Sequence, residues 1–127
     1  MNRINISSGS EYEKPIGFSR AVRISNIISV AGTAPIAADG STAHPDDLYN
    51  QTRRCLEIMS KAITDAGGQL ENVIRTRMFL TDISQWEKAA KAHGEYFSEI
   101  LPACSFIGVK SLIKEDWLVE TEADCVL

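Results

Sequence analysis

Residues 46–80 read DDLYNQTRRCLEIMSKAITDAGGQLENVIRTRMFL, and a change of hydrophobic period within them decides the fold. From Asp46 to Ala66, apolar and small side chains recur every three or four residues, which predicts a long amphipathic helix. Gly67-Gly68 then predicts its end, since glycine breaks helices. From Val73 to Leu80 the period is two, which predicts a strand directly after the helix.

Upstream of this segment the chain reads as short strands. Apolar and β-branched runs predict strands at 4–6, 20–24 and 27–34, with Pro35 ending the third because proline cannot donate to a strand ladder. Ser25-Asn26 separates the second and third runs and predicts a hairpin turn.

Downstream, a second helix and two more strands are predicted. Ser84-Gln85-Trp86-Glu87 has the capping-box pattern of a helix start, and an amphipathic stripe then runs to Ile100 before Pro102 stops it. The runs 105–110 and 118–127 read as strands. The resulting order of elements predicts an α+β fold, with one mixed β-sheet and both helices packed on one face.

The opposite face of this sheet combines charged and apolar side chains. It is too apolar for a solvated surface and too charged for a core, which favours a subunit interface with cross-strand pairs of arginine and carboxylate. The residues expected on it are Val73, Arg75, Arg77, Phe79, Glu120, Glu122 and Asp124.

Composition narrows the class of protein. With 127 residues, 44% hydrophobic, the chain suits a single domain over 1–127. A net charge of −4 and the lack of a basic run argue against nucleic-acid binding. No stretch is apolar enough to span a membrane, and an odd number of cysteines, three, suggests a reducing compartment, so we expect a cytoplasmic protein. No pattern points to a metal or a cofactor.

Seven short segments, in order, resemble the YjgF/Rid (reactive intermediate deaminase) family over nearly the whole chain. The resemblance implies a chorismate-mutase-like fold and a homotrimer, whose sheets form a central barrel with a small-molecule pocket at each subunit boundary. The segments are Gly17 to Val22, Val30-Ala31-Gly32-Thr33-Ala34-Pro35, Gln51-Thr52-Arg53, Ala66-Gly67-Gly68, Met78-Phe79-Leu80-Thr81-Asp82, Leu101-Pro102-Ala103 and Val119-Glu120-Thr121-Glu122-Ala123.

The best understood members of that family hydrolyse 2-imino acids to 2-keto acids and ammonia. In them an arginine after the Pro-Ala pair grips the substrate carboxylate, and the corresponding residue here is Cys104. Ser19, with Phe18 adjacent, stands where members carry a tyrosine, and Ala90 stands where they carry an asparagine. Two residues of the family site are present. The resemblance makes Glu120 the residue that holds the hydrolytic water, and Gly32 the position near which backbone groups contact ligands.

Several of these residues have more than one interpretation. Cys104 can be a reactive thiol, a small residue that shapes the pocket, or a buried strand cysteine, and the last two are favoured. His93 could complete a Cys/His pair from the second helix or a neighbouring subunit, although a histidine at apolar helical spacing more often packs in the core. Glu120 and Glu122 could form an acid/base pair or instead bind strand arginines. Arg77, like Arg75, could grip an anionic ligand, although structural ion pairing is favoured.

Two functions are therefore carried forward. The first is a hydrolase or deaminase of imine or enamine metabolites that uses Glu120 to position water and acts weakly on standard 2-imino acids because Cys104 replaces the arginine. The second is a non-catalytic trimeric module that binds a small metabolite. Some relatives are described as endoribonucleases, but an isoelectric point near 5.1 and the absence of a basic aromatic patch argue against that activity here.

Overall fold

The computed structural model describes residues 2–127, and its elements follow the predicted order. The strands are β1 (Arg3–Ile6), β2 (Ala21–Ile24), β3 (Ile27–Thr33), β4 (Val73–Leu80), β5 (Ala103–Gly108) and β6 (Val119–Val126). The helices are α1 (Glu13–Ile16), α2 (Leu48–Asp65) and α3 (Trp86–Phe97), with short 3₁₀ turns at Leu70–Asn72 and Ile83–Gln85. Helix α1, between β1 and β2, is the one helix among them that the sequence did not predict.

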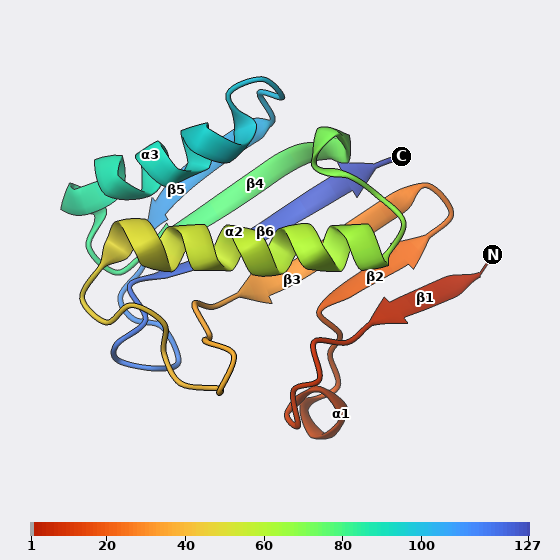
Figure 1. Ribbon diagram of the computed structural model, residues 1–127, viewed down its shortest axis with the longest axis horizontal. Helices are drawn as coiled ribbons and strands as arrows, with labels where there is room; N and C mark the ends of the chain where they lie inside the picture. The colour runs from red at the N-terminus through yellow and green to blue at the C-terminus, as the bar shows by residue number, and fades with distance from the viewer. Residues whose placement is uncertain (1) are drawn as a thin grey trace.

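The six strands form one mixed sheet in the order β1-β2-β3-β6-β4-β5. Strands β4 and β5 are parallel, and every other neighbouring pair is antiparallel. Helices α2 and α3 lie side by side across one face of the sheet (Figure 1). The α+β prediction, a mixed sheet with two helices on one face, is confirmed. No helix within 2–127 is both long and apolar enough to cross a membrane.

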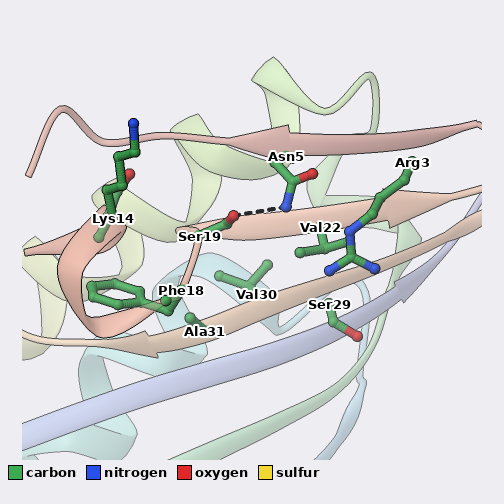
Figure 2. A pocket seen from close by; sticks show the side chains of 11 residues that line it. Arg3, Asn5, Lys14, Phe18, Ser19, Val22, Ser29, Val30 and Ala31 are labelled. Atoms are coloured by element: carbon green, nitrogen blue, oxygen red, sulfur yellow. Dashed lines mark hydrogen bonds between the residues drawn. The ribbon is translucent and has the colours of Figure 1, made fainter.

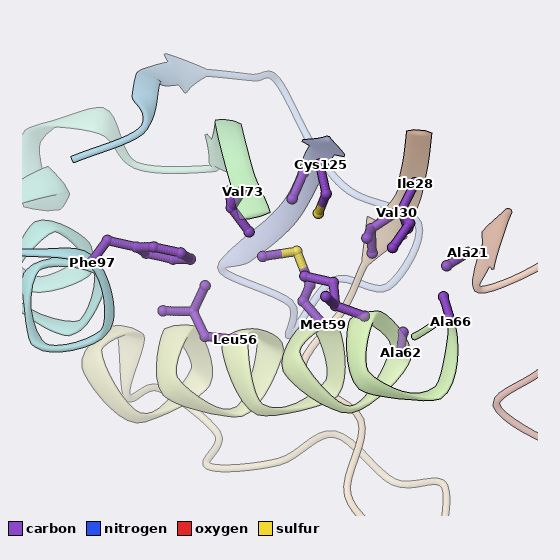
Figure 3. Close-up of a cluster of buried hydrophobic side chains, with 12 residues drawn as sticks. Ala21, Ile28, Val30, Leu56, Met59, Ala62, Ala66, Val73, Phe97 and Cys125 are labelled. Atoms are coloured by element: carbon purple, nitrogen blue, oxygen red, sulfur yellow. The ribbon is translucent and has the colours of Figure 1, made fainter. Parts of the chain in front are cut away.

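The main core fills the space between α2, the end of α3 and the middle of the sheet. In Figure 3, Leu56 and Met59 point from α2 toward the sheet, and Phe97 reaches the same cluster from α3. Each of these three side chains is at most 2% exposed. Burying such side chains stabilises the fold by roughly 1.5–3 kcal/mol each, so this seam fixes the helices on the sheet.

The boundaries of α2 have local causes. The Asp47 carboxylate accepts a hydrogen bond from the backbone N–H of Asn50 at 3.0 Å, which caps the first turn. At the other end Gly67 has φ 91°, a left-handed conformation that glycine adopts without steric cost. The predicted helix is therefore confirmed, with its first turn starting two residues later than Asp46.

One predicted orientation in β4 is wrong. Val73 is in the core at 3% exposed, whereas Ile74 is 53% exposed, the reverse of the prediction from strict alternation. The cause is a bulge: Val73 pairs with Cys125 and Arg75 pairs with Asp124, so Ile74 is an extra residue without a partner on β6. An extra residue shifts the alternation by one. From Arg75 onward the predicted faces are correct.

Candidate functional site

Glu120 lies on the sheet face opposite α2 and α3, called here the outer face. Its neighbours Val119 and Thr121 are fully buried toward the helices, so alternation along β6 turns Glu120 outward. The side chain is half-buried, and among residues 2–127 it has no hydrogen-bond or ion-pair partner. Burial raises the pKa of Glu120, while the charge of Arg20 opposes this rise and that of Glu122 adds to it.

Gly32 lies directly against the Glu120 carboxylate. A Cβ atom placed on Gly32 would be 2.6 Å from Glu120 Oε2. The close approach coincides with a bulge in β3: Val30 pairs with Ala123 and Thr33 with Thr121, so two residues, Ala31 and Gly32, face one on β6. Bulges of this kind redirect the chain locally, and here the bare backbone of β3 meets the carboxylate.

Arg20 is the third member of this cluster, and the sequence analysis did not select it. It immediately precedes β2, and its Nη2 donates a hydrogen bond to the carbonyl of Gly32. Its Nε is buried and, within the described chain, has no hydrogen-bond partner. Burial lowers the pKa of Arg20, and the negative charges of Glu13 and Glu120 oppose that effect.

Glu13 of α1 is the second missed residue. It is only 9% exposed, and its Oε2 accepts hydrogen bonds from the backbone N–H and the hydroxyl of Ser8, at 2.9 and 2.8 Å. Burial by itself would raise the pKa of Glu13. The hydrogen bonds from Ser7 and Ser8, with the charge of Arg20, outweigh burial and lower it. Glu13 is therefore a carboxylate at neutral pH, and its charge helps to hold Arg20.

A groove adjoins this cluster on the outer face, between α1 and strands β1 to β3. It has a volume of about 510 Å³ and is open to solvent. Figure 2 shows Phe18 and Lys14 at one end and Arg3 toward the other, with Asn5 donating a hydrogen bond to Ser19 Oγ at 2.9 Å. The lining residues are Arg3, Asn5, Glu13, Lys14, Gly17, Phe18, Ser19, Val22, Ser29, Val30 and Ala31.

Two of the predicted ligand-binding residues, Phe18 and Ser19, thus lie in the groove. The Phe18 ring also lies 5.7 Å from Cζ of Arg20, within the range of a cation–π contact. Ser19, where the family carries a tyrosine, is occupied by its bond to Asn5. The groove and the cluster of Arg20, Gly32 and Glu120 are therefore neighbouring parts of one surface.

His93 lies on the other side of the sheet, beneath α3. Its Nε2 is 2.8 Å from Thr76 Oγ1, and its ring stacks against Phe97 with centroids 4.7 Å apart. Burial lowers the pKa of His93, so the ring is neutral at neutral pH. Ala90 lies three residues earlier on α3 and is half-buried.

Cys104 belongs to the helix-covered side as well. It pairs with Thr76 across β4 and β5, and it lies two residues before Phe106, whose ring contacts His93. The residue between them, Ser105, accepts a hydrogen bond from Arg75 at 3.1 Å on the outer face. Alternation therefore directs Cys104 away from Glu120. Within this chain the hydrogen bond of His93 goes to Thr76, so no Cys/His pair forms.

Arg77 lies on the outer face but already has partners. Its Nη1 is 3.4 Å from a Glu122 oxygen and 3.1 Å from an Asp124 oxygen. These are cross-strand contacts between β4 and β6, the structural interpretation that the sequence favoured over ligand binding. Arg75 differs from the expectation, because it binds Ser105 rather than a carboxylate.

The chain is similar to known proteins over most of its length. A model of the endoribonuclease L-PSP family matches residues 11–127. A RutC family protein of Pyrococcus abyssi is 35% identical over 111 residues, which covers 87% of both chains. The 3-aminoacrylate deaminase RutC of Acinetobacter baylyi is 33% identical over 102 residues, 79% of both chains.

The fold is also similar to that of solved structures. The crystal structure of Rv2704 from Mycobacterium tuberculosis, described as a member of the YjgF family, superposes with a TM-score of 0.90 at 40% identity. The match covers 99% of this chain and 100% of that one. A structure of TdcF from E. coli with bound serine has a TM-score of 0.81 at 22% identity, and it supports the fold alone.

Proposed function

Because the chain belongs to the endoribonuclease L-PSP family, also known as YjgF/Rid, we propose that it hydrolyses the C=N bond of small imine or enamine metabolites. Residues 1–127 would form a single domain that assembles into a homotrimer. The pocket would lie at each subunit boundary, where the outer face of one sheet meets the next subunit. A cytoplasmic location remains a prediction from the cysteine content.

The observation that carries this proposal is the position of Glu120. It is half-buried, faces the bare backbone of Gly32, and has no partner among the described residues to hold its oxygens. A carboxylate in such a place can orient a water molecule and accept its proton. Burial raises the pKa of Glu120, which makes the acid a better proton acceptor and donor near neutral pH.

The chemistry then proceeds by addition and elimination. Water adds to the carbon of the protonated imine while Glu120 takes one proton from the water, which gives a neutral carbinolamine. Glu120 returns that proton to the amine nitrogen, the C–N bond breaks, and the hydroxyl proton passes to the departing ammonia, so that a carbonyl compound and ammonium are released. An enamine follows the same course after it takes up a proton on carbon and becomes the protonated imine.

Two observations bear on the substrate: the name of one relative, and the residues at which this chain differs from the family pattern. A relative 33% identical to this chain is named a 3-aminoacrylate deaminase, which supports an enamine substrate. Cys104 supplies no positive charge where the family's arginine grips a carboxylate, so we expect weak activity on standard 2-imino acids by comparison with members that carry this arginine. RNA cleavage, to which the family's name refers, is not proposed, because the chain has a net charge of −4.

The second candidate is a trimeric module that binds a metabolite without converting it. The departures at Cys104, Ser19 and Ala90 favour it. Ammonia release from freshly generated 2-iminopropionate and 3-aminoacrylate, with wild type and Glu120→Gln, separates the two candidates. Release faster than in buffer that falls in Glu120→Gln supports the deaminase. Rates equal to buffer for both proteins support the binding module.

A further inference from the structure

Arg20 is a half-buried cation on the outer face that has no carboxylate of the described chain in direct contact. Arg77 has two carboxylate partners within 3.4 Å, but no carboxylate of residues 2–127 lies within ion-pair distance of Arg20. Its Nε is buried without an acceptor, and its one hydrogen bond goes to the neutral carbonyl of Gly32. A desolvated cation with such incomplete compensation gains most from a further negative group.

The place of Arg20 links it to the groove and to Glu120. Its chain neighbour Ser19 lines the groove, and the Phe18 ring covers the guanidinium at 5.7 Å. The Arg20 guanidinium donates a hydrogen bond to the carbonyl of Gly32, the same residue whose backbone lies against the Glu120 carboxylate. Arg20 does not itself line the groove, but an anion bound against Phe18 would lie close to its guanidinium.

We propose that Arg20 is the specificity residue of this site and binds the anionic group of the ligand, the role that Cys104 cannot fill. The inference rests on the proposed function, because it takes the pocket to be the groove beside Glu120. The ligand class it names is a small carboxylate with a short apolar body, since Phe18, Val22 and Ala31 offer apolar surface in the groove.

The two acids near Arg20 do not remove this capacity. The Oε2 atom of Glu13 is held by Ser8 through two hydrogen bonds, and Glu120 reaches Arg20 only at longer range. Arg3 and Lys14 also line the groove, but both are exposed, where a charge in water contributes little. Selectivity for an anion should therefore depend on Arg20 more than on these two.

The test compares two probes of nearly equal shape, pyruvate and its neutral amide, pyruvamide, in NMR titrations of the full-length protein. Wild type should bind pyruvate at least about tenfold more tightly than pyruvamide, as expected for a lost charge-assisted hydrogen bond. Arg20→Gln should reduce the ratio to near one by weakening pyruvate binding alone. Arg53→Gln, which removes an arginine on α2 paired with Glu95, should keep the wild-type ratio.

A second measurement does not depend on a variant that folds. The Arg20 Nε–H signal of the wild type should shift as pyruvate saturates the protein and stay in place with pyruvamide. An unmoved signal, a wild-type ratio near one, or a ratio retained in folded Arg20→Gln would each overturn the inference.

The readout is binding, so it separates this inference from the proposed function. Suppose that Arg20→Gln loses the preference for the anion and that the wild type releases no ammonia. Arg20 then selects the ligand of a binding module, and the proposed deaminase activity is wrong. Suppose instead that the wild type releases ammonia and that Arg20→Gln keeps the preference for pyruvate over pyruvamide. The proposed deaminase activity then stands, and the role of Arg20 is wrong.

Discussion

Gly32 and Glu120 lie so close that no side chain fits between them. A Cβ on Gly32 would be 2.6 Å from Oε2 and 3.2 Å from Cδ of Glu120. The carboxylate therefore rests against backbone, where peptide groups and a bound water can both reach it.

Gly32→Ala should lower ammonia release by about 10- to 100-fold, because misplacing a catalytic group by about 1 Å has effects of that size. The fold should tolerate the change, since the clash falls on the end of a flexible side chain. We expect the free energy of unfolding to stay within about 1 kcal/mol of wild type. Full activity in folded Gly32→Ala would contradict the placement of Glu120 at the reacting atoms.

Gly94→Ala is the matched control for that variant. Gly94 lies within α3, and a Cβ added there meets nothing within 4 Å. The change should raise stability by about 0.5–1 kcal/mol through helix propensity and leave ammonia release at the wild-type level. Thermal melts and the same assay serve both variants.

Glu120→Gln should be at least as stable as wild type at neutral pH. Burial raises the pKa of Glu120 above 4.5, so its stabilising contribution is complete below that pH and is lost as pH rises through the folded-state pKa. The glutamine carries no such dependence. In thermal melts near pH 4 and pH 7, the stability of the variant relative to wild type should increase as pH rises. A large loss of stability in the variant at pH 7 would instead make Glu120 a structural ion-pair residue.

The contribution of His93 to stability should depend on pH in the opposite direction. Burial lowers its pKa below 6.5, so the unfolded chain binds a proton more readily than the folded one. The stability that the neutral ring contributes is complete above pH 6.5 and is lost as pH falls through the lowered pKa. Melting temperature should therefore fall on acidification more steeply in wild type than in His93→Gln. Equal slopes, or an NMR titration of the ring above 6.5, would contradict this.

The proposed trimer makes a prediction about mass. Light scattering during gel filtration should give about three times the 14.0 kDa of the chain. Ile107→Lys places a charge on edge strand β5, at a residue 36% exposed on the outer face, and should shift the protein toward monomer. Glu57→Lys, on an exposed turn of α2, should leave the mass unchanged. A wild-type monomer would remove any pocket built between subunits.

Cys104 tests the missing arginine directly. Cys104→Arg should give a partial gain in 2-imino acid hydrolysis, because Ser19 and Ala90 also differ from the family pattern and the new guanidinium lacks supporting contacts. Cys104→Ser should behave as wild type, since His93 bonds Thr76 and no base among residues 2–127 has a hydrogen bond to the thiol. Strong wild-type activity abolished by Cys104→Ser would instead make Cys104 the nucleophile.

Much of the fold could be predicted because its strongest signals are local. The apolar spacing of α2 and the alternation of β6 each depend on residues close in sequence, and both elements lie where they were predicted. The extra residue Ile74 could not be predicted, because an apolar side chain without a partner looks like any other strand position. Pairing with β6 exposes it.

The candidate site was harder to predict, since it combines distant segments. The family resemblance pointed to Glu120 and Gly32, but it gave no role to Arg20, which lies within the segment Gly17 to Val22, and Glu13 lies outside the seven segments. Their importance arises from tertiary contacts with Gly32 and Ser8. One signal was present in the sequence: an arginine at the start of an apolar strand, directly after Ser19, the residue that replaces the family's tyrosine.

The strand order also governs how the chain can fold as it is synthesised. Strand β6, the last of the six strands in sequence order, occupies the middle of the sheet between β3 and β4. Until it emerges, the β1–β3 unit and the β4–α3–β5 unit each expose an open edge of unpaired backbone groups to other nascent chains. Glu120 lies on this same strand, so the pairing of β6 with β3 and β4 also brings the candidate water-binding carboxylate into place. A chain that lacks β6 therefore cannot form the site.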